Sequence, residues 1–209
     1  MADTFGILQL EEYLTRMGLR LSNVDRQKEI IELAFHGQHG QWRMVVGIQQ
    51  SGDVRKLMLI APHIGTVTKR KRLECLEALM AVNYRIAMGK FGLDLDDGEI
   101  RLEEAVPLAT NSISFEQFQL AFGAIIQTVA MYHSLIPRIV YGNMTAQAAL
   151  IACEQEFFQE VETIAEEQPP DEPGRSDRSD TGTEPAALPE LDVNDVLAEI
   201  SRLFEDQKE

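Results

Sequence analysis

Cysteine and tryptophan are scarce in this sequence of 209 residues, which contains two cysteines and one tryptophan. Cys75 and Cys153 lie far apart, each inside a helical pattern, which argues against a disulfide framework and predicts buried, reduced thiols. The sequence also lacks a basic segment followed by an apolar stretch near its start, and no unbroken run approaches the roughly 18 apolar residues of a membrane span. These absences predict a cytoplasmic protein without membrane insertion.

The short motifs of the common enzyme classes are absent as well. The sequence has no phosphate-binding glycine loop, no G-x-S-x-G, no H-E-x-x-H and no dinucleotide fingerprint. His36 and His39 offer two ligands where a closed metal site needs three or four. The acidic run Asp94–Glu99 is similar to a calcium loop, but Gly98 falls one position too early, so a solvated hairpin turn explains it better. We expect no catalytic residue, no cofactor and no metal, and an enzyme or metal binder is the weakest hypothesis.

Positive charge is in short supply, since 19 lysines and arginines stand against 34 aspartates and glutamates and the net charge is −15. Residues 166–209 hold 14 acidic and 4 basic residues, which leaves a net charge of −5 on the rest of the chain. A general nucleic-acid binder needs lysine and arginine to displace counterions from phosphates. We therefore predict that nucleic acid is not a partner.

Cations are concentrated in the run Lys69, Arg70, Lys71 and Arg72. This run begins a predicted helix, where the helix dipole favours negative charge and each cation costs roughly a few tenths of a kcal/mol. One interpretation is a solvated helix face with little energetic role. The other is a basic patch for an acidic partner, and the nearest candidate is the chain's own acidic C-terminal segment.

Apolar periodicity predicts an α+β domain over residues 1–165. Alternating residues predict half-buried strands, and apolar residues three and four apart predict helices. The pair Asp97-Gly98 between two alternating runs predicts a tight hairpin. We expect the order α-β-β-β-α-β-β-α, with an antiparallel five-stranded sheet, helices packed on one side, and an extra C-terminal helix. The predicted helices are Phe5–Met17, Thr68–Met88, a helix from Ser114 to before Pro137, and Thr145–Ala165; the predicted strands are Glu29–Phe35, Gln41–Gln49, Val54–Ile60, Phe91–Asp94 and Glu99–Leu108.

Two of the predicted helices differ in their apolar faces. The helix that begins at Ser114 has a capping-box partner, Gln117, and a wide apolar face that predicts deep packing. The helix Thr68–Met88 is predicted to bury one narrower stripe. That stripe comprises Leu73, Leu76, Leu79 or Met80, Asn83, and Ile86 or Ala87. Three further aromatic residues, Trp42, Phe157 and Phe158, are expected in the core rather than at an interface.

The segment Val82–Arg101, VNYRIAMGKFGLDLDDGEIR, is the most informative part of the sequence. Its helix end and glycine-flanked hairpin resemble the YbjN-domain proteins, a bacterial family with the fold of type III secretion chaperones. The resemblance covers Phe5–Tyr141. It implies a non-catalytic, chaperone-like protein or adaptor that holds a segment of a partner protein, and it implies a homodimer. The alternative that it leaves open is a regulatory module, in the sense of the family's label of sensory transduction regulator, without contact to DNA.

The sequence changes in character after the last helix of the domain. Residues 166–190 are rich in proline and polar residues and offer almost nothing to bury, which predicts a disordered acidic linker. Residues 191–205 are predicted to form an amphipathic recognition helix, which is too short to be stable alone. It docks on its own domain or, as the long tether favours, on a separate protein. The apolar face proposed to bind the partner comprises Val196, Leu197, Ile200, Leu203 and Phe204.

Overall fold

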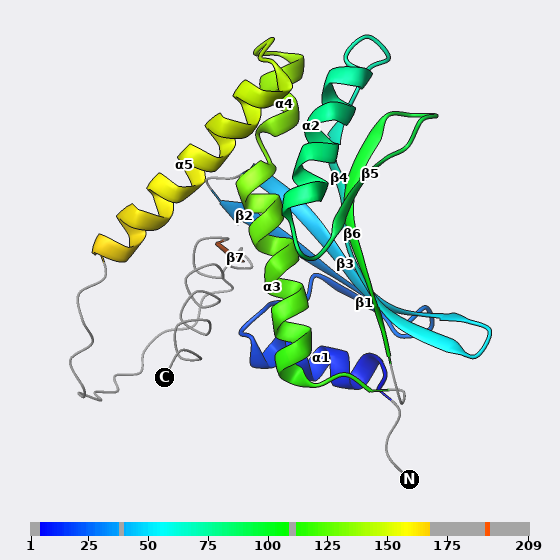
Figure 1. Ribbon diagram of the computed structural model, residues 1–209. Helices are drawn as coiled ribbons and strands as arrows, with labels where there is room; N and C mark the ends of the chain where they lie inside the picture. The colour runs from blue at the N-terminus through cyan, green and yellow to red at the C-terminus, as the bar shows by residue number, and fades with distance from the viewer. Residues whose placement is uncertain (1–4, 38–39, 109–111, 168–190, 193–209) are drawn as a thin grey trace, which may run out of the picture.

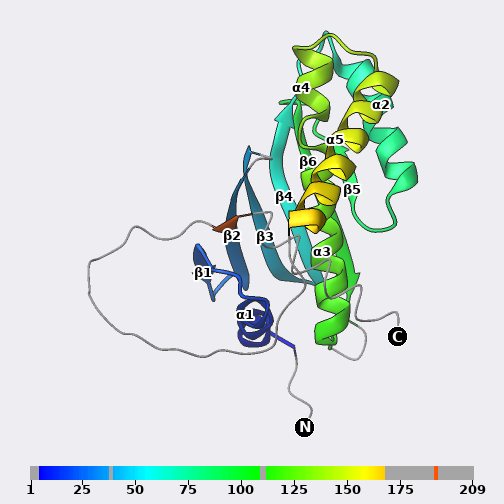
Figure 2. The same ribbon diagram turned by 90° about the vertical axis from the view of Figure 1, so that its left-hand side faces the viewer.

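The computed structural model describes residues 5–37, 40–108, 112–167 and 191–192. In this part of the chain an antiparallel sheet carries helices on one side, which confirms the predicted α+β class (Figures 1 and 2). The helices are α1 (Ile7–Arg16), α2 (Arg72–Arg85), α3 (Phe115–Tyr132), α4 (Leu135–Val140) and α5 (Ala146–Glu167). The strands are β1 (Asn23–Asp25), β2 (Ile30–Gly37), β3 (Gly40–Ser51), β4 (Val54–Thr66), β5 (Lys90–Leu93), β6 (Glu99–Pro107) and β7 (Leu191–Asp192).

The sheet of the described chain runs through six strands in the order β1-β2-β3-β4-β6-β5, each antiparallel to its neighbour. Beside that path, the two-residue strand β7 pairs in parallel with β2. The five predicted strands correspond to β2 through β6, so the expected number of strands was wrong. The strand β1 was missed because three residues, Asn23–Asp25, are too few to show an alternating pattern.

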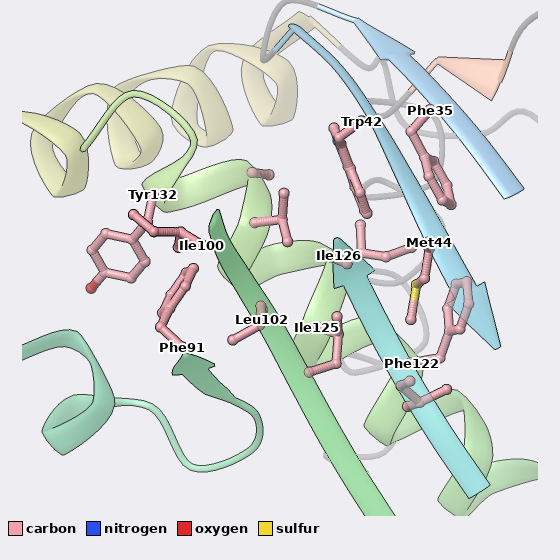
Figure 3. Packing of buried hydrophobic residues seen from close by; sticks show 14 of the residues in the cluster. Phe35, Trp42, Met44, Phe91, Ile100, Leu102, Phe122, Ile125, Ile126 and Tyr132 are labelled. Atoms are coloured by element: carbon pink, nitrogen blue, oxygen red, sulfur yellow. The ribbon is translucent and has the colours of Figure 1, made fainter. Parts of the chain in front are cut away.

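The core lies between the sheet and the helices that cover one of its faces. Alternate residues of β2 and β3 point to this face, so the cross-strand partners Phe35 and Trp42 are both buried, as expected for Trp42. From the helix side, Phe122 of α3 is fully buried in the same cluster (Figure 3). The ring of Tyr13 in α1 lies 5.6 Å from that of Phe118 in α3, which places α1 on the same side of the sheet.

α3 is the central helix of the core. The predicted capping box is confirmed: the Ser114 hydroxyl accepts a hydrogen bond from the Gln117 amide at 3.2 Å, and the Gln117 side chain accepts one from the Ser114 amide at 3.0 Å. The segment Phe115–Val140 has the length and the hydropathy, 1.3, of a membrane-spanning helix, but 61% of its 18-residue apolar window is buried inside the fold. Counting unbroken apolar runs misses this segment, because polar residues interrupt it. In this fold, the apolar residues of the segment pack against the sheet.

α2 differs from its prediction in both length and orientation. It begins at Arg72 after a turn rather than at Thr68, and it ends at Arg85 rather than at Met88. Leu73, which was predicted to be buried, is 81% exposed. The predicted stripe is confirmed at Leu79, which is buried, and was wrong at Leu73 and at the alternative Met80. The reason is that this helix has two apolar stripes, and periodicity does not say which of them meets the core. The stripe that packs comprises Cys75, Ala78, Leu79 and Val82.

The β5–β6 hairpin turns as predicted. The Asp94 amide donates to the Glu99 carbonyl at 2.8 Å, and the Gly98 amide donates to the Asp94 carbonyl at 3.0 Å. Gly98 has φ +80°, which favours glycine, and a Cβ atom there would lie 2.2 Å from the carbonyl oxygen of Val67. The Val67 amide in turn donates to the Gly98 carbonyl at 2.9 Å. The turn is therefore joined to the end of β4 through main-chain atoms.

Part of the C-terminal prediction falls on described residues. Residues 166–167, predicted to belong to the linker, complete α5. Leu191–Asp192, predicted to begin the terminal helix, instead form β7 and pair with Phe35–His36 of β2. The pairing was missed because the free edge of β2, which offers main-chain hydrogen bonds, is far away in the sequence. Outside the described residues lie the rest of the linker and the whole predicted apolar face, Val196, Leu197, Ile200, Leu203 and Phe204.

Candidate protein-binding site

The outward face of α2 carries three large apolar side chains. Leu73, Met80 and Tyr84 are 81%, 64% and 92% exposed. Their spacing of seven and four residues places them on one line along the helix, opposite the stripe that packs against the core. We call these three residues the α2 outer stripe. Glu77 lies on the same line, between Leu73 and Met80, and is also exposed.

A mainly apolar pocket of about 260 Å³ lies between α3, α5 and the loop after α2. Phe158 of α5 forms part of its wall and is 57% exposed, whereas the neighbouring Phe157 is 4% exposed. The expectation of a core position is thus confirmed for Phe157 and wrong for Phe158. Consecutive residues of a helix point about 100° apart, so here Phe157 faces the core while Phe158 lies at the wall of the pocket. The pocket is lined by Ile86, Ala87, Met88, Ala124, Gln127, Thr128, Met131, Tyr132 and Phe158.

A polar contact holds α5 beside α2 and α3. The carboxylate of Glu154 in α5 accepts a hydrogen bond from the hydroxyl of Tyr132 at 2.9 Å and forms an ion pair with Arg85. Burial, together with the hydrogen bond to Glu154, raises the pKa of Tyr132 to about 12. The phenol is therefore neutral at physiological pH and acts as a donor. This contact holds the wall of the pocket in place, and the Tyr132 hydroxyl serves in it as a hydrogen-bond donor.

The predicted basic patch is divided in the structure. Lys69 and Arg70 are exposed in the turn before α2. Lys71 instead forms an ion pair with Glu74 at 3.2 Å and donates a hydrogen bond to the side chain of Asn143 at 2.9 Å. Arg72 lies in the first turn of α2, and its Nε atom is buried without an acceptor among the described residues. Lys71 therefore serves the local structure, Arg72 is partly buried, and Lys69 and Arg70 remain available at the surface.

The titratable side chains of the described residues do not converge on a reactive centre. In that part of the chain, no three histidine, cysteine or acidic side chains are close enough together to hold a metal ion. Cys75 and Cys153 are free thiols, and burial raises the pKa of both, which keeps them protonated. His63 lies 3.2 Å from Glu99, and His39 is outside the described residues. The surfaces of the described chain that could bind a ligand, the α2 outer stripe and the pocket, are therefore mainly apolar.

The α2 outer stripe was not predicted from the sequence. Leu73 was expected to be buried, Met80 was one of two alternatives for a buried position, and no prediction was made for Tyr84. A signal for it was present, since Leu73, Met80 and Tyr84 recur at helical spacing on a helix that already has a second apolar stripe. Two apolar stripes on a helix at the surface of a domain leave one of them exposed. The pocket could not be found in this way, because its walls come from segments far apart in the sequence.

Comparison with known proteins agrees with the resemblance seen in the sequence. A protein family named YbjN, described as "Putative bacterial sensory transduction regulator", matches residues 8–136. No curated protein matches the chain. Among solved structures, that of YbjN from E. coli, described as "a putative transcription regulator", is similar at 15% identity and a TM-score of 0.45, and the match covers 62% of this chain and 90% of that one. Since the family match spans more than half of the sequence, the chain belongs to the YbjN family.

Proposed function

We propose that the protein is a non-catalytic regulatory module that acts as an adaptor by binding another protein through the α2 outer stripe. The observation that carries this proposal is the exposure of Leu73, Met80 and Tyr84 on one line of one helix. Tyrosine and methionine are enriched at protein interfaces, and tyrosine is frequent among the residues that dominate binding energy. The description of the family as a regulator supports the same class of function.

Burial of the α2 outer stripe in a complex with another protein is energetically favourable. Burying a large apolar side chain of this kind stabilises a complex by roughly 1.5–3 kcal/mol relative to leaving it in water. Three such side chains give a compact apolar centre, while Glu77 within the stripe adds a negative charge. The partner that fits is a protein with an apolar surface and a basic side chain placed to meet Glu77. The net charge of −15 opposes binding to nucleic acid.

A cytoplasmic location without membrane insertion completes the proposal. The most apolar segment, Phe115–Val140, is mostly buried within the fold and so offers little surface to lipid. Fractionation of cells that express the full chain checks this point, with recovery in the soluble fraction as the expected result. Retention in washed membranes would contradict it.

Site-specific photo-crosslinking in bacterial cells tests the binding surface. A photoreactive residue at position 84 should give a defined adduct with one protein, whereas the same residue at Leu95, an exposed position in the hairpin turn, should not. The double substitution Leu73→Gln and Met80→Gln should abolish the adduct, because it removes the apolar stripe and keeps good helix formers. An adduct that persists in this variant, or identical adducts from positions 84 and 95, would refute the proposal.

A further inference from the structure

The outer edge of β2 is shared by two short strands. β1 pairs with Ile30–Glu32 at one end of β2, and β7 pairs in parallel with Phe35–His36 nearer the other end. Two paired residues form few hydrogen bonds, and even a whole isolated hairpin is only marginally stable in water. The main-chain hydrogen bonds of β7 are therefore too few to hold it on the edge of β2 by themselves.

The sheet face beside β7 carries two buried aromatic side chains that lie away from the main contacts of α3 with the sheet. Phe35 and Trp42 stack with ring centroids 4.4 Å apart and an interplanar angle of 16°; we call this pair the aromatic plate. Figure 3 shows it at the end of the buried cluster nearest β7. α3 packs mainly over β4 and β6, away from β2. The indole Nε1 of Trp42 is buried without a hydrogen-bond acceptor among the described residues.

The chain that leaves β7 is suited to cover the plate. Val193 follows Asp192 directly, so the predicted amphipathic segment starts at the edge of the strand that carries Phe35. A helix from Val193 to Phe204 would be about 18 Å long, which is shorter than the roughly 26 Å of the eight-residue strand β2. A flexible coil of 23 residues, the number between α5 and β7, would span roughly 25 Å and would impose no tight constraint. Tethering so close to the plate gives the segment a high effective concentration there.

We propose that the segment Val193–Phe204 docks in cis on the aromatic plate, with β7 as its anchor. Its apolar face, Val196, Leu197, Ile200, Leu203 and Phe204, would then be buried against Phe35 and Trp42. Sequence alone favoured recruitment of a separate protein, because the tether is long. The pairing of β7 with β2 favours docking in cis instead. With β7 in place, the tether consists only of the residues that follow Asp192. The proposal is independent of the α2 outer stripe.

The plate contains its own reporter, because Trp42 is the single tryptophan of the chain. In the full-length protein, Leu197→Asp with Leu203→Asp puts two charges on the docking face. We expect the emission of Trp42 to shift to longer wavelength and its quenching by acrylamide to increase. The matched control, Ala198→Asp with Arg202→Gln, makes the same change of −2 in net charge on the opposite side of the predicted helix and should leave both quantities as in the wild type.

Hydrogen exchange separates undocking from unfolding. In the Leu197→Asp, Leu203→Asp variant the amides of β4 should remain protected, while Trp42 becomes accessible. The proposal is overturned if both variants leave Trp42 as shielded as in the wild type, if both expose it equally, or if β4 loses protection together with Trp42. Sedimentation over a range of concentrations identifies the occupant. Shielding that appears only in a dimer would assign the segment to a second copy and refute docking in cis.

Discussion

α2 and α3 lie in the same layer and both carry many apolar residues, but they use them differently. α3 directs large side chains such as Phe118 and Phe122 into the core. α2 packs with small and medium side chains, among them Cys75 and Ala78, and leaves Leu73, Met80 and Tyr84 in solvent. The largest apolar residues of a helix therefore need not mark its buried face. In α3 they stabilise the fold, and in α2 they are available for recognition.

The contrast between α2 and α3 predicts that substitutions in α3 have the largest effect on the free energy of unfolding. Replacement of Phe122 by Ala should lower the free energy of unfolding by about 3–5 kcal/mol, because it removes a fully buried aromatic ring from the centre of the core. Urea denaturation of the full chain measures the change. A loss near zero would mean that α3 does not supply the core contacts, and the contrast with α2 would fail.

A second prediction concerns the C-terminal end of α3. The pKa of Tyr132 is raised from 10.0 to about 12 in the folded protein, so the folded state binds this proton more tightly than the unfolded state. The resulting stability is fully present below pH 10 and is lost as the pH rises towards 12, by roughly 2–3 kcal/mol in total.

Urea denaturation over this pH range tests the prediction with a matched pair of variants. Tyr132→Phe should weaken the loss of stability between pH 10 and 12, whereas Tyr141→Phe, at a position 85% exposed, should retain it. Equal pH profiles for the two variants would show that Tyr132 is not the responsible group.

The smallest effect is expected on the outer face of α2. Met80→Gln should change the free energy of unfolding by less than about 0.5 kcal/mol, because the side chain is 64% exposed and glutamine is a good helix former. Leu79→Gln, one residue earlier and 3% exposed, is the control and should be strongly destabilising. If the two substitutions cost the same, the assignment of the two faces of α2 is incorrect.

Local signals were sufficient for much of the fold. The pair Ser114 and Gln117 predicted the start of α3, and Asp97-Gly98 predicted the hairpin, because a cap and a tight turn are decided by residues close in sequence. The face of α2 depends on what packs against it, and β7 depends on a free edge supplied by β2, far away in the chain. The candidate site was harder to predict than the fold for this reason. Its defining property is exposure, which only the assembled structure decides.

The contact between Gly98 and Val67 limits the substitutions and insertions that this protein can accept at the hairpin turn. Main-chain atoms form it on both sides, so it is closed to any side chain at 98 and needs an amide N–H at 67, where the side chain of Val67 is itself buried in the core. At the tip of the hairpin, the exposed Asp96 is open to variation, whereas the carboxylate of Asp97 accepts a hydrogen bond from the Glu99 amide at 2.8 Å and Gly98 has no room for a side chain. An insertion that lengthens the turn has room only on the Asp96 side, since on the other side it would part the hairpin from the end of β4 and from the turn that leads into α2.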